Sequence, residues 1–268
     1  MGLYRVYAPR QLLAACSPGA MLTSFLETGM VRLEDVFLPS LVECAQREIC
    51  SRLASDECRS RLPRYNSGTG VGYVAPGMEG LIHTGPLKSR RAYDYRPSAF
   101  PEREQPGLSL RPLYEHLARL GESVLKMLSV HFERPLTEVS GGKHLLKAAL
   151  ALNAEADPER EIFPSHRDFS MLTLFLGGAP PGLQVLYKDA WVDVVLEPHE
   201  VLLGAGSFFK RFCPAATVLQ HRVMASTSNR FSFSFFVELP ESTLLPNGET
   251  VAAAVQRLTA AALGVQPA

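Results

Sequence analysis

The feature that most constrains the fold is a change in the spacing of apolar residues after Lys143. Upstream of this point apolar residues recur at helical spacing, whereas downstream they form short runs separated by Gly, Pro and Asp. Many short strands with turn residues between them are typical of a β-sandwich or barrel. We therefore expect strands at residues 144–153, 171–176, 183–187, 191–196, 201–203, 217–224 and 231–237.

Helices are expected on both sides of this strand-rich region. Residues 59–107 are rich in Gly, Pro, Arg and Tyr, and we predict that they form an irregular segment of functional loops. The fold class that follows is mainly β with flanking helices, around a jelly-roll core. The periodicity predicts helices over residues 18–28, 39–53, 111–132 and 250–263, and a short strand over 30–33.

A single domain is expected, because nothing in the sequence resembles a linker. A length of 268 residues suits one large domain. Residues 1–135 would form a mostly helical part with loops around the site, residues 136–240 the jelly-roll core, and residues 241–268 a C-terminal helix.

Composition excludes several classes of function. Lys and Arg together number 27, as do Asp and Glu, and this balance argues against a nucleic-acid-binding protein. The sequence contains neither an apolar stretch long enough to span a membrane nor a secretory signal. The five cysteines are odd in number and form no CxxC pair, which favours free thiols in a reducing compartment. We therefore expect a cytoplasmic protein, and its oligomeric state is not readable from the sequence.

Three residues in the strand-rich region have the pattern of a metal site. His166 and Asp168 are two residues apart, so in an extended chain their side chains point the same way. His221 lies within the predicted strand TVLQHRVM. Two His and one carboxylate form the facial triad of non-haem Fe(II) oxygenases, which leaves coordination positions open for a co-substrate and O2. We interpret His166, Asp168 and His221 as catalytic metal ligands.

A second pair, Arg230 and Ser232, shares one face of the last predicted strand. A guanidinium binds a carboxylate through two parallel charge-assisted hydrogen bonds, and a serine hydroxyl adds a third. The pair therefore suits the distal carboxylate of 2-oxoglutarate. Phe231, Phe233 and Phe235 alternate with these residues and are expected to face the core.

The segments HRDFSMLTLF, GLQVLYKDAWVDVV and LQHRVMASTSNRFSFSFF, in this order, resemble the 2-oxoglutarate/Fe(II)-dependent dioxygenases of the isopenicillin N synthase-like group. The similarity covers about residues 145–240, and the HxDxS form followed by Met-Leu-Thr is nearest to the bacterial deacetoxycephalosporin C synthase branch. The resemblance implies a double-stranded β-helix and Fe(II) bound by His166, Asp168 and His221. It also implies 2-oxoglutarate on Arg230 and Ser232, and O2-dependent release of succinate and CO2.

The sequence departs from this family just before the His-x-Asp segment. Many members have a Tyr-Pro pair there, whose Tyr helps to hold the co-substrate, whereas this chain reads KAALALNAEADP. Asn153 and Lys147 are candidates to replace that Tyr, with Asn153 as our co-substrate prediction. An inward-facing Lys147 requires a carboxylate partner, from the protein or from the substrate.

The substrate is expected to be a small specialised metabolite or an amino-acid derivative. Candidate substrate contacts are Lys147, Arg91, Tyr93, Tyr73 and Phe169, with Arg90 and Tyr95 in the same irregular segment. Asp168 argues against halogenation, because related halogenases have Ala or Gly at that position. Hydroxylation, desaturation and ring chemistry all stay open.

Two alternatives stay open at the sequence level. One is an Fe(II) oxidase of the isopenicillin N synthase type, in which Arg230 and Ser232 hold the carboxylate of the substrate itself. The other is a jelly-roll isomerase or binding protein that keeps the His cluster without oxidation. The Arg230–Ser232 pair argues against an isomerase, which needs no dicarboxylate anchor.

Overall fold

The computed structural model describes residues 18–34, 39–66, 69–76, 90–99, 109–133, 136, 144–152, 161–226 and 228–262. Asn153 and Cys16 lie outside these residues. The helices are α1 (Pro18–Thr28), α2 (Pro39–Ala54), α3 (Asp56–Ser60), α4 (Leu110–His131), α5 (Ser207–Phe212) and α6 (Val251–Ala262), with a 3-10 turn at Pro97–Ala99. The strands are β1 (Met30–Leu33), β2 (Gly72–Val74), β3 (Arg90–Tyr95), β4 (Leu145–Ala151), β5 (Glu161–His166), β6 (Leu172–Leu176), β7 (Leu183–Tyr187), β8 (Ala190–Asp193), β9 (Val201–Ala205), β10 (His221–Met224) and β11 (Arg230–Val237).

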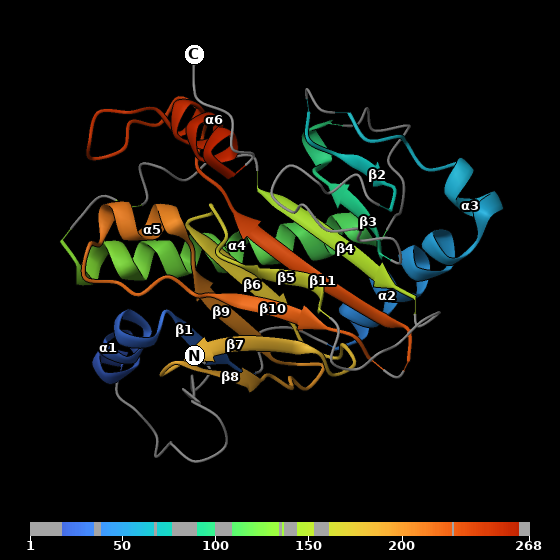
Figure 1. Ribbon diagram of the computed structural model, residues 1–268, viewed down its shortest axis with the longest axis horizontal. Coiled ribbons are helices and arrows are strands. Elements are labelled where there is room, and N and C mark those ends of the chain that lie inside the picture. The colour runs from blue at the N-terminus through green and yellow to red at the C-terminus, as the bar shows by residue number, and fades with distance from the viewer. Residues whose placement is uncertain are drawn as a thin grey trace.

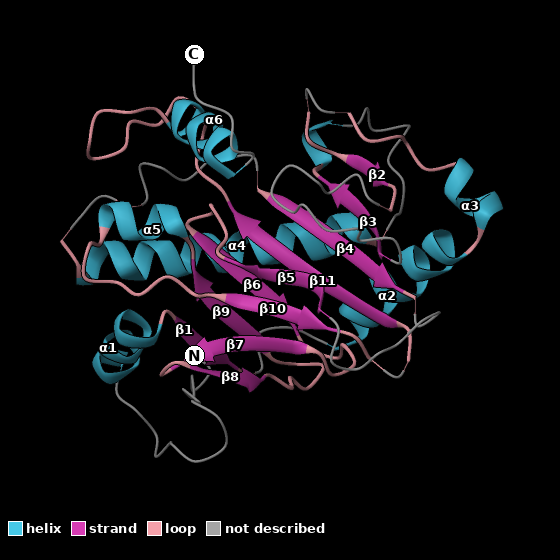
Figure 2. Ribbon diagram, in the orientation of Figure 1, coloured by secondary structure: helices cyan, strands magenta, loops and turns pink. Residues whose placement is uncertain are grey.

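The strands form two antiparallel sheets, and the fold class predicted from the sequence is confirmed. The large sheet has the order β1-β9-β6-β11-β4-β3-β2, and the small sheet has the order β5-β10-β7-β8. Figure 1 shows the small sheet in front of the large one, with α4 running behind the large sheet. Figure 2 shows the same arrangement as a strand-rich centre with helices at the periphery, which is the layout of a jelly roll with flanking helices.

Each long strand of the large sheet has one apolar face and one face that lines a cavity. On β11, Phe231, Phe233 and Phe235 are buried in the main core, as the alternation of the sequence predicts. On β4, Leu146 and Leu150 enter the same core, which α2 and α4 cover with their own apolar faces. The other face of these strands is more polar and is turned toward the small sheet.

Two strands lie within the segment 59–107, which the sequence predicted to be irregular. Strands β2 and β3 extend the large sheet, with Tyr93 of β3 opposite Ala148 of β4. The pattern of β3, RRAYDY, places Arg90 and Asp94 on the cavity face, and Tyr93 and Tyr95 on the core face. The polar face of β3 is therefore turned toward the cavity and not toward bulk solvent.

Strand β5 and helix α5 were also absent from the sequence prediction. Strand β5 contains Pro164, which removes a backbone donor, and a strand at the edge of the small sheet tolerates that loss. Helix α5 lies between the predicted strands 201–203 and 217–224, where no element was expected from the sequence. None of the helices in the described part of the chain is both long enough and apolar enough to span a membrane.

His144, directly before β4, links three elements of the fold. Its carbonyl oxygen accepts hydrogen bonds from Arg96 Nε at 3.1 Å and from Tyr114 Oη of α4 at 3.0 Å. Its Nδ1 accepts the backbone N–H of Glu238, after β11, at 3.1 Å. Burial and the nearby Arg96 lower the pKa of His144 from 6.5 to about 4, so the folded protein holds a neutral imidazole.

This buried imidazole makes the free energy of unfolding depend on pH. Since the pKa of His144 is lower in the folded protein, its contribution is complete above pH 6.5 and is lost as the pH falls toward 4. Between pH 7.5 and 5, we expect wild type to lose about 2 kcal/mol more stability than His144→Gln, measured by urea unfolding. Substitution of the exposed His131 by Gln should leave the wild-type pH dependence unchanged, and equal losses in wild type and His144→Gln would contradict this account.

Candidate metal and 2-oxoglutarate site

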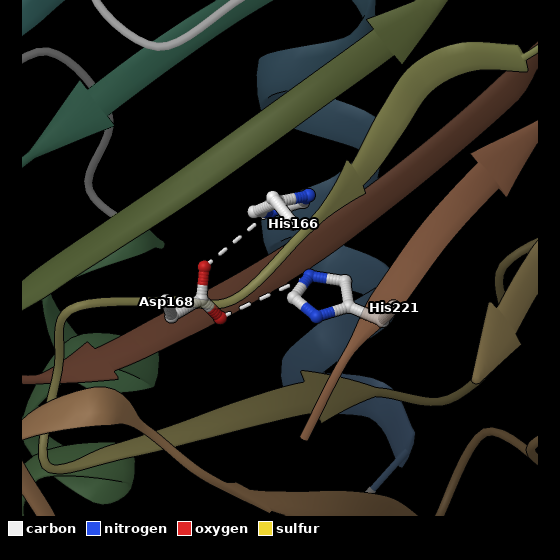
Figure 3. A group of neighbouring side chains, drawn as sticks. All are labelled: His166, Asp168 and His221. Atoms are coloured by element: carbon white, nitrogen blue, oxygen red, sulfur yellow. Dashed lines mark ion pairs between the residues drawn. The ribbon is translucent and has the colours of Figure 1, made fainter. Parts of the chain in front are cut away.

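The two histidines are brought together by strand pairing in the small sheet. In the antiparallel register of β5 and β10, His166 lies directly opposite His221. The centroids of the two imidazole rings are 4.1 Å apart, and Figure 3 shows Asp168 beside both rings. Asp168 Oδ1 lies 3.4 Å from His166 Nε2, and Asp168 Oδ2 lies 3.9 Å from His221 Nε2. Sequence segments more than fifty residues apart therefore meet at one point.

These three residues can provide one ligand atom each to a single metal ion. The ligand atoms lie within 4.8 Å of one another, and among the described residues this is the one His, Cys, Asp or Glu cluster of that kind. All three side chains are largely removed from solvent, with exposed fractions of 14% for His166, 12% for Asp168 and 5% for His221. Two imidazoles and one carboxylate form a donor set that suits Fe(II) and leaves coordination positions open.

The surrounding structure holds two of the three ligands, His166 and Asp168, in an orientation that suits a metal. His166 Nδ1 lies 2.8 Å from the carbonyl oxygen of Pro164, a contact that places the proton on Nδ1 and leaves the Nε2 lone pair for a metal. The Thr173 hydroxyl donates to Asp168 Oδ2 at 2.6 Å and lies 2.9 Å from Ser170 Oγ. Outer-shell contacts of this kind are a regular part of metal sites in proteins.

A glycine next to α5 allows the loop that carries Asp168 to pack tightly. A Cβ atom at Gly206 would lie 1.9 Å from the carbonyl oxygen of Ser170, so any larger residue would displace the loop. The following residue, Ser207, donates its N–H to the carbonyl oxygen of Asp168 at 2.8 Å. The unpredicted helix α5 thus begins where it supports the ligand loop.

The electrostatics of the cluster favour the protonation states that bind a metal. Burial alone would raise the pKa of Asp168, but the imidazoles of His221 and His166 and the Thr173 hydroxyl lower it below its ordinary value. Burial lowers the pKa of His221 to about 4. At neutral pH the group therefore presents an anionic carboxylate and a neutral His221, the forms in which these side chains act as ligands.

Arg230 and Ser232 lie on the cavity face of β11, as their spacing predicts. Arg230 Nη1 donates to Ser232 Oγ at 2.8 Å, and Arg230 is buried, with only 7% of its surface exposed. Its Nε is a buried donor that has no hydrogen-bond partner. Both residues line a cavity of about 330 Å³ together with His166, Asp168 and His221. The cavity therefore holds a metal-type cluster and an unsatisfied guanidinium donor.

The cavity also contains a buried ion pair. Lys147 Nζ lies 2.8 Å from Asp94 Oδ1, and both side chains line the cavity. The carboxylate partner expected for Lys147 is thus a protein residue from β3, which the sequence prediction did not include. Because β3 was read as irregular, its alternation gave no basis for placing Asp94 opposite Lys147.

Phe169 lines the cavity, whereas the other aromatic candidates do not. Tyr93 is fully buried on the core face of β3, and Tyr73 is opposite Tyr93 on β2 and packs against the same core. These two placements correct the expectation that Tyr73 and Tyr93 contact substrate. Tyr65, which the sequence did not single out, lines the cavity instead.

Arg91 is turned away from the cavity as well. Its Nη1 donates to the carbonyl oxygen of Leu53 at 3.1 Å, at the C-terminal end of α2. Cations are favourable at this end of a helix, so Arg91 stabilises α2, and it is not among the residues that line the cavity. Its neighbour Arg90 points to the opposite face of β3 and lines the cavity.

Comparison with known proteins agrees with this arrangement. Residues 145–239 match the model of the 2OG-Fe(II) oxygenase superfamily. The chain is 26% identical to leucoanthocyanidin dioxygenase from Perilla frutescens over 148 residues, which are 51% of this chain and 41% of that protein. It is 25% identical to flavonol synthase/flavanone 3-hydroxylase from Arabidopsis thaliana over 138 residues, which are 48% of this chain and 41% of that protein. The matched regions thus span about two fifths of these relatives.

Solved structures share the fold over most of the chain. A full-length Neurospora crassa protein in complex with alpha-KG has a TM-score of 0.74 at 16% identity and covers 89% of each chain. The Arabidopsis thaliana dioxygenase for auxin oxidation 1, bound to 2-oxoglutarate, has a TM-score of 0.72 at 14% identity and covers 84% of this chain and 88% of that one. Such low identities establish the fold alone. The family match over residues 145–239 supports the 2OG-Fe(II) oxygenase superfamily.

Proposed function

We propose that this protein is an Fe(II)- and 2-oxoglutarate-dependent dioxygenase that oxidises a small molecule and releases succinate and CO2. The observation that carries the proposal is the presence of two groups in one cavity. The first is the cluster His166, Asp168 and His221, and the second is the pair Arg230 and Ser232. One cavity can therefore bind both ends of a 2-oxo dicarboxylate, one at a metal and the other at a guanidinium.

In this proposal the cluster holds Fe(II), which binds the keto acid and activates O2 when it is present. The described residues fit that ion, because the ligand atoms already converge, Asp168 is an anionic carboxylate and His221 is a neutral imidazole. Pro164 and Thr173 keep the His166 and Asp168 donors oriented. A carboxylate at position 168 fills the coordination position that a halogenase leaves for chloride, so we assign oxidation and not halogenation.

Arg230 binds the distal carboxylate of 2-oxoglutarate, and Ser232 positions the guanidinium and adds a hydroxyl. The buried Nε of Arg230 has no hydrogen-bond partner, and a carboxylate would satisfy it while neutralising a desolvated charge. Asn153, outside the described residues, stays our prediction for a further co-substrate contact.

The walls of the cavity indicate the kind of substrate. Its volume of about 330 Å³ suits a small molecule. Phe169, Phe175 and Phe236 provide apolar walls, whereas Lys147 and Asp94 form a polar pair on the same lining. We propose a substrate that has both an apolar body and a polar group, such as a specialised metabolite or an amino-acid derivative. The plant flavonoid dioxygenases among the relatives support the first of these classes.

Within the superfamily, we propose a place near the deacetoxycephalosporin C synthase branch. The support for this is the run from His166 to Thr173, which has the HxDxS form followed by Met-Leu-Thr. We also propose that residues 1–268 act as one catalytic domain, since helices α2 and α4 pack directly on the sheet that carries the site.

Removal of one ligand should abolish tight metal binding. For Asp168→Ala we expect Fe(II) to bind about 100-fold or more weakly, measured by anaerobic titration calorimetry, because the anionic ligand of a three-residue set is lost. Asp193→Ala, which removes an exposed carboxylate of β8, is the matched control and should bind Fe(II) as wild type does. Equal affinity in Asp168→Ala and wild type would remove Asp168 from the metal site.

Loss of the guanidinium should affect the co-substrate and spare the metal. For Arg230→Ala we expect the 2-oxoglutarate concentration at half-maximal succinate formation to rise by roughly 100-fold, since a buried charge-assisted pair is lost. Fe(II) affinity should stay at the wild-type value. The exposed Arg111→Ala on α4 serves as the control. An unchanged 2-oxoglutarate requirement would favour an oxidase in which Arg230 holds another carboxylate.

A further inference from the structure

We propose that Arg90 is a second cationic anchor for 2-oxoglutarate and binds its distal carboxylate together with Arg230. The inference rests on the proposed function and assigns a role to a residue outside the family motif. It starts from the position of Arg90 at the beginning of β3, two strands away from Arg230 on the same sheet.

The strand register places Arg90 and Arg230 at the same level of the sheet. Ala151 of β4 is the register partner of Arg230 on one side and of Arg90 on the other. Adjacent strands are about 4.8 Å apart, so the two Arg backbones are separated by roughly 10 Å, a span that two Arg side chains can close. Both side chains line the same cavity.

Small residues leave the space between these side chains open. The cavity face of β4 presents Ala151 and then Ala149, and the equivalent position of β3 is Ala92. Ala151 is the residue of β4 at the level of the two arginines, and its side chain is only a methyl group. This part of the lining is therefore suited to a ligand that approaches the sheet closely.

The guanidinium of Arg90 is held next to the metal-type cluster. Its Cζ lies 4.2 Å from the centre of the Phe163 ring, a distance typical of a cation–π contact. The Phe163 ring in turn packs against the His166 ring, with centroids 4.6 Å apart. The Phe163 ring is therefore in contact with both the Arg90 guanidinium and the ring of the proposed iron ligand His166.

The charges of this region favour a bound anion. Burial, together with the positive charge of Arg90, lowers the pKa of Arg230 to about 10. Two guanidiniums directed into one cavity repel each other, and a carboxylate bound between them would remove that repulsion.

This assignment also accounts for the departure from the family motif. The stretch before the His-x-Asp segment has no Tyr to help hold the co-substrate. Arg90 enters the cavity from β3 and supplies a hydrogen-bond donor, with a full positive charge in addition. A neutral phenol is thereby replaced by a cation from a different strand.

The test compares two keto acids that bind iron in the same way. 2-Oxoglutarate has a distal carboxylate and pyruvate has none, and the binding of each to the Fe(II) protein is followed anaerobically by its weak visible charge-transfer absorption. For Arg90→Leu we expect the dissociation constant of 2-oxoglutarate to rise about 10- to 100-fold and that of pyruvate to change less than about twofold. Arg90→Lys, which keeps the charge, should recover part of the 2-oxoglutarate affinity.

Arg91→Leu is the matched control, because Arg91 is the next residue of the same strand and faces α2. It should bind both keto acids as wild type does. Wild-type affinity for 2-oxoglutarate in Arg90→Leu would overturn the inference while leaving the proposed function intact, as would an equal loss of both keto acids. Failure of the wild-type protein to bind 2-oxoglutarate at all would overturn both.

Discussion

The pairing of β5 with β10 is the interaction on which the rest of the site depends. Its register sets His166 opposite His221, and the chain leaves β5 directly after His166 to bring Asp168 beside both rings. Neither strand is long, and β5 contains Pro164 at the edge of its sheet. The geometry of the cluster therefore depends on supports from outside these strands, namely the Thr173 hydroxyl and the start of α5.

The large sheet provides the other part of the site, because one face of its strands packs in the core and the other lines the cavity. The strands β3, β4 and β11 each alternate between side chains for the core and side chains for the cavity. On the cavity face the rows run from Arg230 and Arg90, through small residues, to the pair Lys147 and Asp94. On this face of the sheet, small residues thereby separate the two arginines from the Lys147–Asp94 pair. This separation allows a keto acid and a substrate to occupy one cavity in different places.

Much of this arrangement could be predicted from local sequence patterns. The period-2 alternation of FSFSFF located β11 and assigned its faces, and the His-x-Asp spacing with the later His identified the cluster. Strand β3 was missed because Arg90 and Asp94 face the cavity, whereas alternation rules assign charged residues to solvent. The partner of Lys147 and the level shared by Arg90 and Arg230 depend on pairing between distant strands, which no local pattern encodes. For the same reason no local pattern could show that Tyr93 and Arg91 lie on the face of β3 that is turned away from the cavity.

The central claim is that Fe(II) and 2-oxoglutarate act together in this cavity, and the stoichiometry of co-substrate consumption tests it most directly. Purified protein would be supplied with Fe(II), 2-oxoglutarate and O2, and succinate, CO2 and O2 uptake would be measured together. The account predicts equal amounts of succinate and CO2 for each O2 consumed, slow without the organic substrate and absent without Fe(II). Tight binding of Fe(II) without any succinate would contradict it and favour an oxidase or an isomerase.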